Sequence, residues 1–174
     1  GLIFIVSDFG LTYLMLKEVS RDEKKAQYYF ENISTLKLIL GLFSIILTLI
    51  ISFFLNKDLI IIRALWIVSI VQFFSMFSTF FSQFFNSFNK MNISAIVNTI
   101  ERVVALILGL YFLITTKSLI FLVMALLFAN IFRLFYFIFK AKSRVNLNFN
   151  FNFLILKELL IKGFPFFLTG VFVY

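Results

Sequence analysis

The stretch LIIIRALWIVSIVQFFSMFSTFFSQFF at residues 59–85 contains a single charged residue, Arg63. Crossing the hydrocarbon core of a membrane as a helix takes roughly 20 apolar residues, so this stretch is long enough to do so. Arg63 lies close to one end, where its long side chain can reach the headgroup region. The stretch therefore predicts a transmembrane helix.

Similar apolar stretches occupy most of the remaining chain. Residues 38–55, 93–114 and 118–139 predict three further full spans, and residues 1–16 and 159–174 predict two partial ones. We therefore predict an all-α protein, a polytopic transmembrane helical bundle with four full spans and two partial ones. The chain begins without methionine and stops inside an apolar stretch, so we expect it to be a fragment of a longer protein.

The composition agrees with a membrane protein and argues against several other classes. Hydrophobic residues make up 62% of the chain and charged residues 14%, which leaves too little polar surface for a soluble domain. The net charge is +8, and most of the charged residues lie between the apolar stretches. This placement indicates positioning at a membrane and no nucleic-acid partner. Without cysteine or histidine, thiol and imidazole catalysis and the usual zinc sites are excluded. We predict no enzyme, no metal and no cofactor.

The basic residues predict the orientation of the spans. Most of the 16 lysines and arginines lie in three alternate linkers: residues 17–37, 86–92 and 140–162. The positive-inside rule places these linkers in the cytoplasm. Residues 17–35 are polar enough to predict a short cytoplasmic linker helix. The opposite linkers, 56–58 and 115–117, are very short and predict tight antiparallel hairpins.

The span at 59–85 has two faces. Its polar side chains recur at steps of three and four residues and occupy one arc roughly 100° wide: Gln72, Ser75, Thr79, Ser82, Gln83 and Asn86. The phenylalanines between them occupy the other side, which we expect to face lipid. The polar stripe is too long for helix packing alone, so we interpret it as the wall of a wet cavity.

The other spans carry comparable stripes. That of the first span combines small residues with Lys37 and hydroxyls, and is explained by close helix packing: Lys37, Gly41, Ser44, Thr48 and Ser52. The third and fourth include Asn98, Glu101, Arg102 and Arg133. We expect these faces to converge on one polar interior.

Ionisable side chains inside the spans are costly, at about 2.5–3.5 kcal/mol each at the bilayer centre on insertion scales. Asp8, Glu101, Arg102 and Arg133 are in this position. Two explanations remain open. The residues line a transport path, or they form structural ion pairs such as Glu101 with Arg133 or Asp8 with Arg102.

The last partial span contains the single proline, Pro165, between Gly163 and Gly170. Such residues mark kinked or broken helices, and we interpret the three as a hinge. A proline in the first turn of a helix is the alternative explanation.

Three motifs together resemble a known family. SDFGLTYLMLKEVSR at 7–21 resembles the second helix of Wzx-type flippases of polysaccharide biosynthesis, relatives of MATE-type multidrug exporters and lipid II flippases. IERVVALILGL at 100–110 is similar to their fifth helix, and KGFPFFLTGVF at 162–172 to the proline-bearing start of their seventh. The resemblance implies helices two to seven of a fourteen-helix, two-lobe transporter. Residues 1–158 would form most of the first lobe, and 159–174 the start of the second.

The resemblance implies that the protein flips lipid-linked oligosaccharide, a polyprenyl-pyrophosphate glycan, across the plasma membrane by alternating access. Its partners would be membrane lipid, the lipid-linked glycan and other membrane proteins of polysaccharide assembly. In that role Arg102 and Arg133 would attract phosphate. Glu101 or Asp8 would carry a coupling proton. The sugar-binding candidates are Gln72, Thr79, Gln83, Asn86 and Asn98.

Two alternatives stay open. The first is a small-molecule or drug exporter of the same superfamily, which would need an acidic cavity for cationic substrates. The second is a membrane-embedded glycosyltransferase or polymerase, which would need a carboxylate cluster outside the membrane. The only such pair, Asp22 and Glu23, is flanked by lysines in a solvated segment, which disfavours an enzyme.

Overall fold

The computed structural model describes residues 8–54 and 59–173, and across these ranges it contains helices and no strand. The elements in order are α2 (Leu11–Arg21), the 3-10 turn η1 (Glu23–Lys25), α3 (Ala26–Phe54), α4 (Leu59–Asn86), α5 (Met91–Thr116), α6 (Leu119–Ala141) and α7 (Phe153–Val173). Four of the described helices are long and apolar enough to cross a membrane: Glu23–Ser52, Ile61–Asn86, Met91–Thr116 and Ile120–Ala141. The prediction of an all-α polytopic bundle is confirmed.

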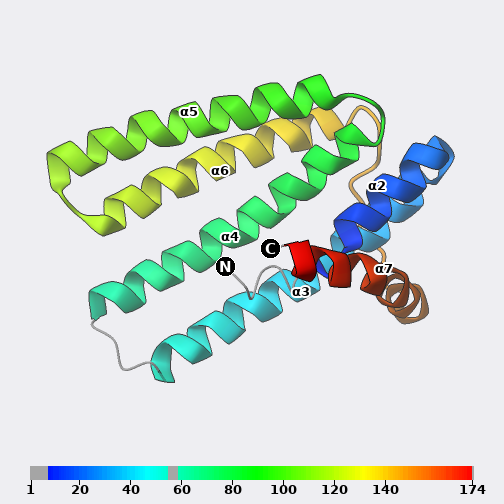
Figure 1. Cartoon of the computed structure of the whole chain (residues 1–174), viewed down its shortest axis with the longest axis horizontal. Coiled ribbons are helices and arrows are strands. Elements are labelled where there is room, and N and C mark those ends of the chain that lie inside the picture. Colours follow the sequence, from blue (N-terminus) through cyan, green and yellow to red (C-terminus); the bar gives the residue numbers. More distant parts are fainter. Residues whose placement is uncertain (1–7, 55–58, 174) are drawn as a thin grey trace.

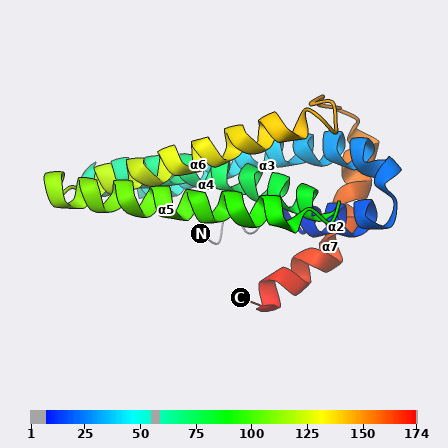
Figure 2. The ribbon, with the colours of Figure 1, turned by 90° about the horizontal axis from the view of Figure 1, so that it is seen from above.

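The four long helices lie side by side, and α4 is the central one (Figure 1). It packs chiefly against α6 and α3, and it also contacts α2 and α5. α5 packs mainly on α6, so these two helices form a hairpin at one edge of the bundle. α2 and α7 pack on each other at the end where α3 begins (Figure 2).

The connections alternate between the two ends of the bundle. η1 and the linkers at 87–90 and 142–152 gather at one end, and the turn between α5 and α6 lies at the other (Figure 1). Lys117 forms that turn in the left-handed conformation, with φ of 49°. This arrangement agrees with the alternation predicted for the basic linkers. The assignment of the basic end to the cytoplasm stays a prediction.

α3 begins earlier than expected. The chain turns at Asp22, whose side chain accepts a hydrogen bond from the Lys24 backbone N–H, and α3 is continuous from Ala26. The prediction of a separate linker helix at 17–35 is therefore wrong. Polar residues in the first turns of α3 bond to their own helix, since Asn32 donates to the Tyr28 carbonyl and Thr35 to the Glu31 carbonyl. Hydrogen bonds of this local kind let polar residues continue a helix.

The first stripe packs as expected for most of its length. A Cβ at Gly41 would lie 2.8 Å from the side chains of Phe73 and Met76, so α3 and α4 approach each other closely there. At the far end the Trp66 indole N–H donates to Ser52 Oγ at 3.3 Å. Small residues and hydroxyls thus join the two helices.

The aromatic face of α4 is not a lipid-facing surface at the basic end. Phe80, Phe81, Phe84 and Phe85 are buried, with exposed fractions of at most 5%. Their rings pack on Phe30 of α3 and on Phe137 of α6, and centroids are 5.0–5.8 Å apart. The expectation that this face turns to lipid is therefore wrong for these four. Because α4 is central, neighbouring helices cover both of its faces there.

Candidate functional site

An ion pair joins the two helices of the α5–α6 hairpin. Nη1 of Arg133 lies 3.9 Å from Oε2 of Glu101, and the two side chains are only 12% and 14% exposed. The guanidinium carbon lies 5.9 Å from the centre of the Phe137 ring. Nε of Arg133 is buried with no hydrogen-bond partner among the described residues. The arginine is thus neutralised by a long contact and keeps donor capacity for a further ligand.

A row of hydrogen bonds joins α4 to α5 near their connecting turn. The Asn98 amide donates to Ser82 Oγ at 3.4 Å, and Ser94 donates to Asn86 Oδ1. The Asn86 amide donates to Gln83 Oε1 at 3.0 Å. We call these five residues the polar seam. Primary amides inside a span must find such partners, because lipid offers none.

The seam contains three of the predicted sugar-binding residues, Gln83, Asn86 and Asn98. Oδ1 of Asn98 remains buried without a partner among the described residues, so the seam has an unused acceptor. These three residues meet between α4 and α5, and their role in sugar binding stays a prediction.

Other predicted residues lie outside the seam. Thr79 and Arg102 are exposed on the surface of the described chain, and Gln72 is half-buried further along α4. The expected convergence is therefore wrong for Thr79 and Arg102. Arg102 directly follows Glu101, the partner of Arg133. Its assignment to phosphate binding, like those of Thr79 and Gln72 to sugar binding, stays a prediction.

A second ion pair lies near the start of α2. Lys37 is completely buried and its ammonium pairs with the Asp8 carboxylate, which also accepts a 2.5 Å hydrogen bond from Thr12. The ammonium lies 5.5 Å from the centre of the Phe80 ring. The partner of Asp8 is thus Lys37, and the alternative pairing with Arg102 is wrong. Sequence reasoning missed Lys37 because it stands at the edge of an apolar stretch, where lysines usually reach solvent.

The predicted hinge residues lie in α7, next to the start of α2. A Cβ at Gly163 would lie 2.8 Å from the Phe9 carbonyl oxygen, and one at Gly10 2.5 Å from the Gly163 carbonyl oxygen. Gly163 therefore permits close backbone contact between α2 and α7. Pro165 stands inside α7, well after its first turn, and the ribbon changes direction along this helix (Figure 2). The hinge role of Gly163, Pro165 and Gly170 stays a prediction.

Across residues 8–54 and 59–173 no three aspartates or glutamates lie close enough together to hold a metal ion.

The described helices include four of membrane length, and the bundle encloses two ion pairs and the polar seam. These features define the class of protein as a polytopic α-helical membrane protein with a partly polar interior. The family model described as polysaccharide biosynthesis protein matches residues 1–174, the whole chain given. The chain therefore belongs to the polysaccharide biosynthesis protein family, as the three motifs indicated, and this family connects it with polysaccharide assembly. The chain has no significant match among curated proteins or among solved structures.

Proposed function

We propose that the protein flips lipid-linked oligosaccharide, a polyprenyl-pyrophosphate glycan, across the cell membrane by alternating access. The observation that carries this proposal is Arg133, an arginine held inside a transmembrane hairpin of a polysaccharide biosynthesis protein. An arginine in this position costs a few kcal/mol to insert. Attraction of a pyrophosphate supplies a reason to retain it.

Arg133 is suited to exchange partners. Its contact with Glu101 is 3.9 Å long, so neither group is held in the short two-bond geometry of a strong arginine–carboxylate pair. A phosphate offers oxygens that match the guanidinium fork, and it would compete well in a site of low dielectric constant. Arg102, one residue after Glu101, adds a second positive charge to the same part of α5.

When phosphate takes Arg133, Glu101 is left without its partner. In this proposal Glu101 carries the coupling proton that accompanies the movement of the substrate. Sequence reasoning left Glu101 and Asp8 as coupling candidates. Asp8 is bound by both Lys37 and Thr12, so we propose Glu101 for this role.

The glycan would contact the amide side chains next to this pair. Gln83, Asn86 and Asn98 are joined by exchangeable hydrogen bonds, and amides can replace those by bonds to sugar hydroxyls. Thr79 and Gln72 extend the same face of α4. Rocking of one lobe against the other, with α7 bending near Gly163, Pro165 and Gly170, would expose the site alternately to each side.

A drug or small-molecule exporter of the same superfamily is the second candidate, and the carboxylate of Glu101 favours it. A cationic substrate would pair with Glu101 and be repelled by Arg133 and Arg102, so the local balance of charge supports an anionic substrate. We propose no enzymatic role. Asp22, half of the acidic pair an enzyme would need, caps η1 and lies 4.0 Å from Lys25.

The test is transport by the complete protein in proteoliposomes that contain a fluorescent lipid-linked glycan. We expect Arg133→Gln to lower the flipping rate about tenfold or more, as loss of a charge-assisted hydrogen bond implies. Arg133→Lys should rescue only part of the rate, because a lysine lacks the guanidinium fork. Arg63→Gln, near the N-terminus of α4, is the matched control. Normal flipping by Arg133→Gln, or acceptance of cationic drugs only, would contradict the proposal.

We further propose that the protein resides in the plasma membrane with its basic linkers in the cytoplasm, alongside other membrane proteins of polysaccharide assembly. A cysteine placed at Lys142 should be shielded from an impermeant thiol reagent in intact cells. One placed at Lys117, at the opposite end of the bundle, should be labelled. The reverse pattern would show that the orientation is wrong.

A further inference from the structure

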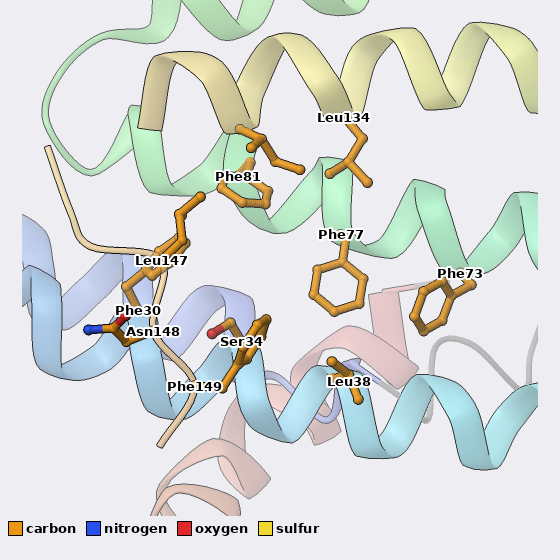
Figure 3. A pocket seen from close by; sticks show the side chains of 11 residues that line it. Phe30, Ser34, Leu38, Phe73, Phe77, Phe81, Leu134, Leu147, Asn148 and Phe149 are labelled. Atoms are coloured by element: carbon orange, nitrogen blue, oxygen red, sulfur yellow. The ribbon is translucent and has the colours of Figure 1, made fainter. Parts of the chain in front are cut away.

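A cavity of about 340 Å³ lies between α3, α4, α6 and the linker that follows α6 (Figure 3). Its walls are almost entirely apolar and include Phe30 and Leu38 of α3, Phe77 of α4, Leu134 of α6, and Leu147 and Phe149 of the linker. Several of these side chains are half-buried, so the cavity is not sealed. We call it the linker pocket.

The linker pocket is separate from the candidate transport site. None of the polar seam residues lines it, nor does Glu101 or Arg133. Leu134 faces the pocket, whereas the preceding residue, Arg133, pairs with α5 on another side of α6. Successive helical residues point about 100° apart, which explains how one helix serves both places.

The size of the pocket suits a single hydrocarbon chain. It lies at the small end of the range for ligand sites, about 300–1,000 Å³, and is too apolar for a glycan. Its walls extend from Phe30 to Leu38 and from Phe73 to Phe81, which is roughly 12 Å along each helix axis at 1.5 Å per residue. A lipid chain in a bilayer runs in the same general direction as the helices.

The linker is fixed over the pocket by hydrogen bonds to α3. The Gln27 amide donates to the Asn146 carbonyl and accepts from the Asn146 N–H, both at 2.9 Å. The Asn150 N–H donates to Thr35 Oγ1 at 3.1 Å. Leu147, Asn148 and Phe149 are therefore held between two anchoring points at the basic end of the bundle.

Positive charge lies on the chain shortly before the linker residues of the pocket. Lys140, Lys142 and Arg144 directly precede the linker residues of the pocket, and all three are exposed. Within the part of the chain that the structure describes, none of them forms an ion pair. The guanidinium of Arg144 lies 4.9 Å from the centre of the Phe88 ring, which positions it at this end.

The nearby carboxylates are already engaged or lie apart from these cations. Asp22 pairs with Lys25, and Glu31 accepts a hydrogen bond from Gln27. Glu23 lies in the solvent-exposed turn η1. The positive charge after α6 is therefore available to an anionic headgroup.

We propose that the linker pocket binds one acyl chain of an anionic phospholipid from the leaflet that borders the basic linkers, with its phosphate on Lys142 and Arg144. The acyl chain would then occupy the apolar pocket, and the headgroup would meet the basic residues that follow α6. The bound lipid would hold the linker between α6 and α7 against α3. This inference does not depend on the proposed flipping activity.

Native mass spectrometry of the full-length protein, titrated with phosphatidylglycerol and with phosphatidylcholine of identical chains, tests the proposal. We expect phosphatidylglycerol to bind more tightly, by about fivefold for each basic residue that contacts it. Lys142→Gln with Arg144→Gln should abolish this preference, and Lys117→Gln at the opposite end should preserve it. Equal affinity of the wild-type protein for both lipids would overturn the headgroup site.

The chain site is tested by filling the pocket. Leu38→Trp should weaken binding of both lipids about tenfold, since it removes the space for several buried methylene groups. Leu42→Trp is the matched control, because Leu42 lies on the same helix, is 47% exposed and does not line the pocket. Unchanged binding by Leu38→Trp would contradict the proposal.

Photocrosslinking locates the chain even if Leu38→Trp fails to fold. Phosphatidylglycerol with a photoreactive group near the end of its acyl chain should label residues 30–38 or 147–149 of the wild-type protein. Labelling confined to other faces would overturn the proposal. A second result would also overturn the proposal: polyprenyl phosphate displaces phosphatidylglycerol and labels the same residues. The pocket would then belong to the carrier lipid of the glycan.

Discussion

The α5–α6 hairpin differs from the α3–α4 part of the bundle in how much of its apolar surface is buried. In the most apolar window of α3 and of α4, 39% of the residues are buried, against 17% in α5 and 28% in α6. α3 and α4 are held by aromatic rings and by close approach at Gly41. The hairpin instead exposes long rows of apolar side chains, which suits a surface that faces lipid or another part of the protein.

The two ion pairs repeat this difference. Lys37 is completely buried, touches Asp8 directly and lies over the Phe80 ring. Arg133 and Glu101 meet at 3.9 Å and leave Nε of the arginine unpaired among the described residues. A buried charge without its partner destabilises a protein strongly, so the tight pair is well placed to hold the fold. The loose pair can change partners at lower cost, which is what transport requires.

The largest effect should come from breaking the tight pair. Lys37→Met leaves Asp8 without its counter-charge and should destabilise the full-length protein by about 3 kcal/mol or more. Thermal unfolding in detergent and membrane abundance measure this loss. Lys24→Met, which removes an exposed lysine from η1, should change neither.

A double variant separates charge from packing at the same place. Asp8→Asn with Lys37→Met removes both charges and should recover most of the stability lost in Lys37→Met alone. Failure of the double variant to recover would mean that the shape of the lysine, not its charge, holds α2 to α3.

A smaller effect is expected from the glycines of the two regions. Gly163→Ala places a methyl group 2.8 Å from the Phe9 carbonyl oxygen, which is backbone and cannot move easily, and should cost about 1–3 kcal/mol. Gly109→Ala in the hairpin meets only Leu122 Cδ1 at 3.3 Å. That side-chain end can shift, and alanine favours the helix, so the change should be neutral or slightly stabilising. Equal losses in thermal stability would remove the contrast between the regions.

The smallest effect concerns the polar seam. Asn98→Leu removes the bond to Ser82 and should cost about 0.6 kcal/mol, the average for interhelical hydrogen bonds in membranes. Thr99→Val is the control, because Thr99 is exposed and bonds only within its own helix. A loss of several kcal/mol would assign Asn98 to the fold and not to substrate binding. Thermal unfolding of purified variants makes the comparison.

The sequence was sufficient for the long helices, because uninterrupted apolar stretches of membrane length have few other structures open to them. It also named the Glu101–Arg133 pair as one example of a structural ion pair, which was one of two explanations left open for the charges inside the spans. It did not predict where α3 begins, because Asn32 and Thr35 satisfy their polar groups on the preceding turn.

Tertiary placement explains the other errors. A phenylalanine side chain packs favourably against lipid and against another helix. The spacing of Phe80 and Phe84 therefore does not show whether they contact lipid or a neighbouring helix. The partner of Asp8 likewise depends on how α2 crosses α3, and Lys37 could be found only by asking which buried carboxylate lacked a cation. Exposure of Arg102 and Thr79 depends on the angle between α4 and α5, which periodicity does not determine.

The most direct test measures glycan flipping per inserted molecule for two neutralised pairs, Glu101→Gln with Arg133→Gln and Asp8→Asn with Lys37→Met, in the complete protein. Because the first change removes the exchangeable charges but strands no partner, we expect near-normal abundance with flipping lowered about tenfold to a hundredfold. The second change also strands no partner, so we expect near-normal abundance together with near-normal flipping per molecule. Normal flipping by the protein without Glu101 and Arg133 would contradict the account.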